Sequence, residues 1–265
     1  MAQYTGVKMM IDVQSQKDLR GIAIQKVGIK DLNWPIVVMD KENKTQTTIA
    51  KITAAAELKG DMRGTHMSRF IEAIDELNVV GPKEIEKLLD RIKEKLDSQK
   101  AYVRFDFPYF INKRTPVTGT LAPLKVDCYF EAEKGEKFDL KVGVIVPVHT
   151  LCPCSKEISE YGAHNQRAYV TIEVKMRRFM WIEELVEIAE SSASCPLYSI
   201  LKRPDEKWVT ERAYQNPKFV EDLLREVVVK ISSDKRIKWY KVFVESIESI
   251  HNHNAFAYIE GENTK

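Results

Sequence analysis

Residues 83–111, KEIEKLLDRIKEKLDSQKAYVRFDFPYFI, contain a change of hydrophobic period that decides the fold. Residues 83–96 place apolar side chains three and four positions apart, which is the spacing of one face of an α-helix. That face consists of Ile85, Leu88, Leu89, Ile92 and Leu96. From Ala101 onward apolar and polar residues alternate, which is the period of a half-buried β-strand. The stretch therefore predicts a helix followed by a strand of a sheet.

Similar elements flank this stretch on both sides. Before it, residues 34–40 and 45–58 are rich in β-branched side chains and are separated by the turn-like DKENK, so they predict two strands. Residues 66–77 then predict a helix, which Gly81-Pro82 separates from the next one. Residues 124–134 return to strand alternation. The predicted order is strand, strand, helix, helix, strand, strand.

The same order recurs after the turn at residues 134–136. Strands are predicted at 137–149 and 167–176, a helix at 181–192, and final strands at 238–250 and 255–260. Asn216 and Pro217 predict the N-cap and first residue of a second helix. We therefore predict an α+β protein of two tandem β2α2β2 units with antiparallel sheets. The predicted parts are an N-terminal segment (1–30), a first unit (31–134) and a second unit (135–265).

Helix pairs of this kind cover one face of an antiparallel sheet. The other face and the sheet edges then remain open, and open edges pair readily with other chains. We therefore expect the protein to oligomerise into a closed barrel.

Composition excludes several classes of protein. The chain has 265 residues, 44% hydrophobic, and a net charge of +2 from 41 Lys and Arg against 39 Asp and Glu. This apolar content is too high for a disordered chain. The balanced charge provides no overall excess of basic residues for binding nucleic acid. No apolar run approaches the about 18 residues of a membrane span, and the N-terminus lacks a secretory signal. We expect a soluble, cytoplasmic protein that binds neither nucleic acid nor a membrane.

Three polar stretches fit neither a core nor a short loop. They are residues 149–170 between two predicted strands, 191–217 between two predicted helices, and 249–257 in the last hairpin. Segments that break local rules are often functional. Cys128, by contrast, lies within strand alternation and is predicted to be a small core residue.

Thiol and imidazole groups are concentrated in the first and third of these stretches. Cys152 and Cys154 are two residues apart, so in extended backbone both would face one way, and His164 follows after a turn at Gly162. His251 and His253 repeat this alternation. Thiolate and imidazole suit Zn²⁺ or Fe²⁺, and a carboxylate ligand widens the choice to Mn²⁺. A metal site that leaves one coordination position open to water is typical of catalysis, because the metal lowers the pKa of the bound water to near neutral.

Ordinary structural explanations exist for each of these residues. The CPC cysteines can be free thiols, and HNHN can be a polar turn. Glu221 can interact with the dipole of the capped helix. Glu206, Lys202 and Arg203 fit a solvated charged run, although the two basic residues could also meet a phosphate.

Four longer strings carry a resemblance to a known family. They are DVQSQKDLRGIAIQKVGI (12–29), KGDMRGTHMSRF (59–70), LCPCSKEISEYGAHNQRAYVTIEV (151–174) and SSASCPLYSILKRPDEKWVTERAYQNPKFVEDLLREVV (191–228). Together they resemble the type IB GTP cyclohydrolases over nearly the whole chain, from Asp12 to His251. The resemblance implies the tunnelling fold, assembled as a homotetramer with active sites at subunit interfaces. It also implies a divalent metal (Zn²⁺, Mn²⁺ or Fe²⁺) and conversion of GTP and water to 7,8-dihydroneopterin triphosphate and formate, which begins folate and pterin synthesis.

The resemblance also implies roles for individual residues. The CPC segment supplies the metal thiolate, with Cys154 preferred and Cys152 the close alternative. His164, Glu206 and His251 match the other residues near the metal, and Glu221 matches the glutamate that anchors guanine. The expected site residues are Cys152, Cys154, His164 and His251 for catalysis, the same four with Glu206 for the metal, and Glu221, Lys202, Arg203 and His66 for the substrate.

The expected chemistry is opening of the guanine imidazole ring at C8. Water activated by the metal attacks C8 while a histidine relays protons to N7 and N9. Formate leaves, the ribose rearranges and the freed amine closes the pterin ring. Two other functions remain open at this point: a nitrile reductase of the same fold with a cysteine nucleophile and NADPH, and a non-catalytic binding module.

Overall fold

The computed structural model describes residues 12–14 and 16–263, so residues 1–11 of the predicted N-terminal segment lie outside the described part. Eight strands form one antiparallel sheet in the order of the sequence. The strands are β1 (Ile24–Asp40), β2 (Lys44–Leu58), β3 (Ala101–Arg114), β4 (Leu121–Lys134), β5 (Phe138–Leu151), β6 (Asn165–Met176), β7 (Ile237–Ile247) and β8 (Ala255–Glu262). The helices are α1 (Ser68–Asp75), α2 (Pro82–Leu96), α3 (Pro153–Ile158), α4 (Ile182–Ser192), α5 (Arg203–Gln215) and α6 (Val220–Ser233). None of the helices in the described ranges is long and apolar enough to cross a membrane.

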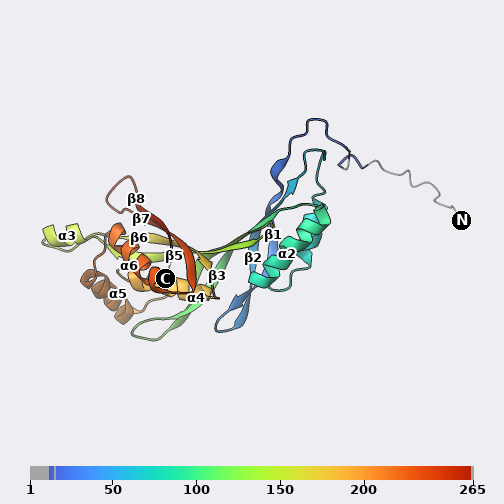
Figure 1. Ribbon diagram of the computed structural model, residues 1–265. Helices are drawn as coiled ribbons and strands as arrows, with labels where there is room; N and C mark the ends of the chain where they lie inside the picture. Colours follow the sequence, from blue (N-terminus) through green and yellow to red (C-terminus); the bar gives the residue numbers. More distant parts are fainter. Residues whose placement is uncertain (1–11, 15, 264–265) are drawn as a thin grey trace.

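The sheet is strongly curved, and its larger helices lie on the convex side (Figure 1). In that view α2 lies beside β1 and β2 at one end, while α4, α5 and α6 lie beside the later strands at the other end, and α3 projects from that second end. The predicted α+β class and antiparallel pairing are confirmed. Within residues 12–14 and 16–263, the concave side of the sheet carries no helix (Figure 1).

The core lies between the convex face of the sheet and the helices. The predicted face of α2 is buried in full, and β3 buries every second residue from Ala101 to Tyr109. Each fully buried Leu or Ile contributes roughly 1.5–3 kcal/mol. This exceeds the helix-propensity differences between ordinary residues, which stay below about 1 kcal/mol. The apolar stripe therefore fixes the position of α2. Cys128 is also buried, as predicted, and burial raises the pKa of its thiol.

Helices in the second half differ from the prediction in two respects. Residues 203–215 form α5, where we expected an irregular connection. Pro204 and the acidic Asp205 and Glu206 in its first turn favour the start of a helix. We did not predict this helix because these residues lie within a long polar stretch. The predicted N-cap at Asn216 is also wrong, because α6 begins at Val220. Asn216 instead ends α5, and its amide donates hydrogen bonds to the carbonyl oxygens of residues 193 and 194.

The order of elements is β1, β2, α1, α2, β3, β4 in the first half and β5, α3, β6, α4, α5, α6, β7, β8 in the second. The second half thus contains two helices, α3 and α5, beyond the predicted pair. All eight strands belong to one continuous sheet, with β4 and β5 paired from Asp127–Ile145 to Lys134–Phe138. The division into tandem units at residues 134 and 135 stays a prediction.

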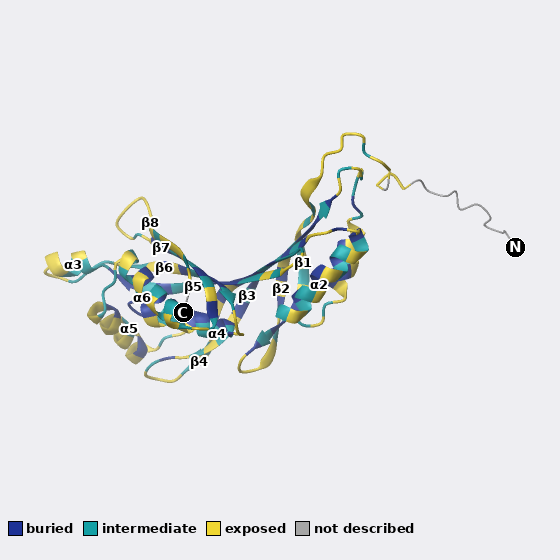
Figure 2. Cartoon of the chain, in the orientation of Figure 1, coloured by how far each residue is buried: buried dark blue, intermediate teal, exposed yellow. Residues whose placement is uncertain are grey.

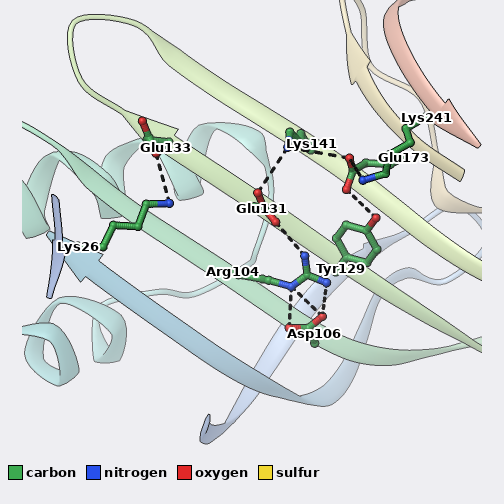
Figure 3. Close-up of polar contacts among 9 residues, drawn as sticks. All are labelled: Lys26, Arg104, Asp106, Tyr129, Glu131, Glu133, Lys141, Glu173 and Lys241. Carbon is green, nitrogen blue, oxygen red and sulfur yellow. Dashed lines mark hydrogen bonds and ion pairs between the residues drawn. The ribbon is translucent and has the colours of Figure 1, made fainter. Parts of the chain in front are cut away.

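The helix-free face carries a network of charged side chains (Figure 3). Tyr129 lies across Gly143, where an added Cβ would come within 2.1 Å of its ring, and its hydroxyl donates to the buried carboxylate of Glu173 over 2.7 Å. Lys241 pairs with the same carboxylate at 2.9 Å, and the Arg104 guanidinium stacks on the Tyr129 ring at 4.1 Å. The remaining pairs of the network join Arg104 to Asp106 and Glu131, Lys141 to Glu131, and Lys26 to Glu133. These charges are neutralised within the chain, although part of the face remains exposed (Figure 2).

Candidate metal and substrate site

The CPC segment forms the start of the short helix α3. Cys152 is its N-cap and Cys154 lies in its first turn, while Pro153 occupies the first helical position. The expectation that both thiols project from extended backbone is therefore wrong, because a proline at this position favours a helix. The Cys152 sulfur accepts a hydrogen bond from the Ser155 amide at 3.5 Å. Both cysteines are free thiols; Cys152 is partly buried and Cys154 is exposed.

His164 is held against this turn by backbone contacts. The Cys152 amide donates to the His164 carbonyl at 3.1 Å, and the His164 amide donates to the Ser155 hydroxyl at 3.2 Å. The intervening loop reverses at Gly162, whose φ of +131° is a conformation that side chains rarely adopt. Local turn geometry therefore brings the CPC segment and the predicted loop histidine together.

The hydrogen bonds of Gln166 indicate which nitrogen of His164 carries the proton. The Gln166 amide nitrogen lies 3.4 Å from a carboxylate oxygen of Glu248, which only accepts when ionised. The Gln166 carbonyl oxygen therefore faces His164, at 2.9 Å from its Nδ1. In a neutral imidazole, an acceptor at this position favours the tautomer with the proton on Nδ1, in which the Nε2 lone pair is available to a cation.

The loop between β7 and β8 approaches His164 from another side. The Ser249 hydroxyl lies 3.3 Å from His164 Nδ1. His251 and His253 follow in the same loop, where both are exposed. Their rings are nearly parallel, with centroids 5.1 Å apart and an interplanar angle of 9°. The two histidine rings therefore stack on each other in a loop that contacts the His164 ring through Ser249.

Three predicted site residues, Lys202, Arg203 and Glu206, lie at the N-terminus of α5. Lys202 is the N-cap, and its carbonyl accepts the Glu206 amide at 2.9 Å. Arg203 projects into solvent and pairs with the half-exposed Glu206 carboxylate at 3.1 Å. Glu221 lies in the first turn of α6 and is also exposed.

His66 lies in a different part of the molecule. Its Nε2 is 3.3 Å from a carboxylate oxygen of Asp12, and it precedes α1, which packs on α2. Helices α2 and α3 lie at opposite ends of the molecule (Figure 1). The fold of one chain therefore does not bring His66 to the CPC segment.

The described residues contain no group of three or more His, Cys, Asp or Glu side chains that could hold a metal ion. Among the described residues, the backbone places the CPC segment beside His164, but the predicted donor side chains do not form a cluster with one another. Thiol and imidazole are suitable donors for Zn²⁺ or Fe²⁺. A complete site requires further donors, from a rearranged loop or from another subunit.

The sequence-based prediction missed three residues near these groups. Gln166 and Ser249 contact the His164 ring, and the fully buried Asp205 accepts hydrogen bonds at the start of α5. Strand alternation could have indicated Gln166, two residues after His164. The spacing of Lys202 and Asp205 is that of a helix-capping pair. Ser249 has no local signal, because its contact spans 85 residues.

Comparisons with known proteins identify the family. Residues 10–257 match the family described as type I GTP cyclohydrolase folE2. The chain is 98% identical over 256 residues to the GTP cyclohydrolase FolE2 of Caldicellulosiruptor saccharolyticus, covering 97% of this chain and 100% of that protein. It is 57% identical over 251 residues to the protein of the same name from Thermotoga maritima, covering 95% and 97%.

Solved structures with a similar fold include urate oxidases of much lower sequence identity. Uricase from Arthrobacter globiformis aligns with a TM-score of 0.50 and 8% identity over 90% of this chain and 93% of that one. Urate oxidase from Bacillus subtilis aligns with a TM-score of 0.52 and 7% identity over 90% and 98%. These similarities support the predicted tunnelling fold. The sequence matches show that the chain belongs to the FolE2 family of type I GTP cyclohydrolases.

Proposed function

We propose that this enzyme acts in the cytoplasm and converts GTP and water to 7,8-dihydroneopterin triphosphate and formate, the first step of folate and pterin synthesis. The observation that carries the proposal is the backbone hydrogen bond between Cys152 and His164, which places a cysteine and a histidine side by side in the fold. Membership of the FolE2 family supports GTP as the substrate.

The proposed cofactor is a divalent cation, Zn²⁺, Mn²⁺ or Fe²⁺. Its ligands are Cys154, with Cys152 as the alternative, and Nε2 of His164, completed by Glu206 or His251. A bound divalent cation supplies Lewis-acid activation of water near neutral pH. The tautomer assigned to His164 supports this role, because it leaves Nε2 unprotonated.

The proposed assembly is a homotetramer with active sites at subunit interfaces. His66 and α3 belong to opposite ends of one chain, so a site that uses both needs a second subunit. The incomplete donor set among the described residues of one chain supports the same arrangement. Closure of the sheet into a barrel would also pair its edge strands, β1 and β8.

Glu221 is proposed to bind the guanine base. Its carboxylate accepts hydrogen bonds from guanine N1 and the exocyclic amine, a donor pair that adenine lacks. A carboxylate left unpaired in the complex would make discrimination against adenine large. Lys202 and Arg203 are proposed to bind the triphosphate, since both lie at the exposed start of α5.

The chain's own residues must also move protons during the reaction. Ring opening breaks one of the two carbon–nitrogen bonds at C8 and release of formate breaks the other, so N7 and N9 each gain a proton as their bond to C8 breaks. A histidine near the metal that is not itself a ligand is proposed to relay these protons, because an imidazole can exchange them near neutral pH. The ribose then undergoes an Amadori-type rearrangement, and the freed amine closes the six-membered pterin ring.

A turnover assay tests the proposal. GTP is added to metal-free and to metal-loaded protein, and formate and a fluorescent oxidised pterin are measured. Both products are expected only with metal. Incubation with NADPH and a nitrile substrate is the companion assay, since nitrile reduction without formate release from GTP would instead support a reductase.

A further inference from the structure

The segment from Glu190 to Glu206, which leads into α5, is held by the β3–β4 hairpin from the other half of the chain. Lys113 of β3 forms a largely buried ion pair with Glu190 at 2.6 Å and donates to the Leu197 carbonyl at 2.9 Å. Ser199 donates to the carbonyl of Pro123 in β4 at 2.6 Å. The segment is thus attached to both strands of this hairpin.

Asp205 joins the start of α5 to the loop of this hairpin. It is fully buried, and one carboxylate oxygen accepts the amides of Val117 and Thr118 at 2.9 and 3.0 Å. The other oxygen accepts the Thr118 hydroxyl at 2.6 Å and the Lys202 amide at 3.1 Å. A single carboxylate therefore caps α5 and binds the hairpin loop at the same time.

This arrangement couples the hairpin to residues with proposed roles. Lys202 is the N-cap of α5 and Glu206 lies in its first turn, so the backbone positions of both residues depend on how the start of α5 is held. A displacement of a positioning element by about 1 Å can reduce the rate of an enzyme roughly 100-fold. The orientation of α5 therefore depends on a loop that lies 87 residues earlier in the chain.

We infer that Asp205 is a positioning residue, which uses the β3–β4 hairpin to orient the first turn of α5, with Lys202 and Glu206, for the reaction. The inference rests on the proposed function, since it assigns a second part of the chain to the same site. Asp205 itself contacts neither substrate nor metal, because its oxygens are occupied by the hairpin and the helix cap.

A matched control separates positioning from helix capping. Glu184 lies at the corresponding position of α4, where it accepts the Trp181 amide at 2.9 Å and pairs with Arg236 at 3.0 Å. Helix α4 carries none of the proposed site residues. Glu184→Gln therefore replaces a capping carboxylate and its ion pair with Arg236 by a neutral amide, and it is the matched control for Asp205→Asn.

The test compares the holoenzyme with Asp205→Ala, Asp205→Asn, Thr118→Val and Glu184→Gln, well below their melting temperatures. Asp205→Ala should lower kcat for formate release roughly 10- to 100-fold. Asp205→Asn should recover much of this loss, because its amide oxygen can still accept the Val117 and Thr118 amides. Thr118→Val should lower kcat in the same direction, and Glu184→Gln should leave kcat and KM unchanged. Hydrogen exchange at the Val117 and Thr118 amides should accelerate in Asp205→Ala and remain slow in Asp205→Asn.

Two outcomes would overturn the inference in different ways. If Asp205→Ala melts at a lower temperature but retains wild-type kcat and KM, Asp205 has a structural role only. If the metal-loaded wild-type enzyme releases no formate, the proposed function fails, and the inference fails with it. The first outcome leaves the proposed function intact, so the two failures are distinguishable.

Discussion

The backbone amide of Cys152 donates a hydrogen bond to the carbonyl of His164 across 3.1 Å, which closes a loop between the end of β5 and the start of β6. Because the main chain makes this bond, either residue can be substituted without removing it. Variants of the thiol and of the imidazole therefore test the chemistry of the side chains and leave the turn in place.

The first prediction concerns which thiol binds the metal. Cys152→Ser and Cys154→Ser each replace sulfur by a hydroxyl, and the hydroxyl of Cys152→Ser would still provide an N-cap acceptor for the Ser155 amide. The variant that removes the ligand should lose bound metal and formate release together, since a hydroxyl is a poor ligand for a soft cation. Metal content of the purified protein is the measurement. If both variants retain stoichiometric metal, the thiolate assignment is wrong.

The second prediction concerns the orientation of His164. Gln166→Leu removes the oxygen that faces Nδ1, so the ring loses the contact that fixes its tautomer. Loss of such a partner usually weakens metal binding about 10- to 100-fold. Competition with a chromogenic chelator measures the affinity. Ser249→Ala is the control, because its hydroxyl lies farther from the same nitrogen, at 3.3 Å, and should have the smaller effect. Equal affinity of Gln166→Leu and wild type would contradict the assignment.

The parts of this molecule that sequence predicted are those with a local signal. The stripe of α2 and the alternation of β3 repeat within a few residues, and both are buried as predicted. The extended backbone expected at the CPC segment was wrong because Pro153 starts a helix there. The contact of Asp205 with Thr118 could not be predicted in this way, since a side-chain hydrogen bond across 87 residues leaves no periodic pattern.

The third prediction concerns recognition of the base. The Glu221 carboxylate would accept two hydrogen bonds from guanine. In Glu221→Gln the amide NH2 group replaces one accepting oxygen, so one N–H group of guanine faces another donor. A hydrogen bond to a charged group contributes about 1.5–3 kcal/mol, so KM for GTP should rise roughly 10- to 150-fold. Metal content should not change. Asp222→Asn is the control, because this neighbouring carboxylate accepts the Phe219 amide within its own helix. Loss of metal in Glu221→Gln would show that the carboxylate serves as a ligand instead.

The last prediction is a pH dependence of stability that arises from Asp205. Burial acts to raise the pKa of this carboxyl, but the hydrogen bonds from Thr118, Val117 and Lys202 outweigh burial and hold the pKa well below its ordinary value. The unfolded chain therefore binds this proton more readily than the folded chain does. The resulting stabilisation is fully present at pH values above about 3.9, the pKa of an aspartate in the unfolded chain. It is lost progressively as the pH falls from there towards the lower pKa of Asp205 in the folded chain. Urea unfolding of wild type and Asp205→Asn at pH 7, 5 and 3 should give free energies of unfolding whose difference is nearly the same at pH 7 and 5 and smaller at pH 3. A difference that is constant over this range would mean that the carboxylate charge contributes nothing to the attachment of α5 to the hairpin.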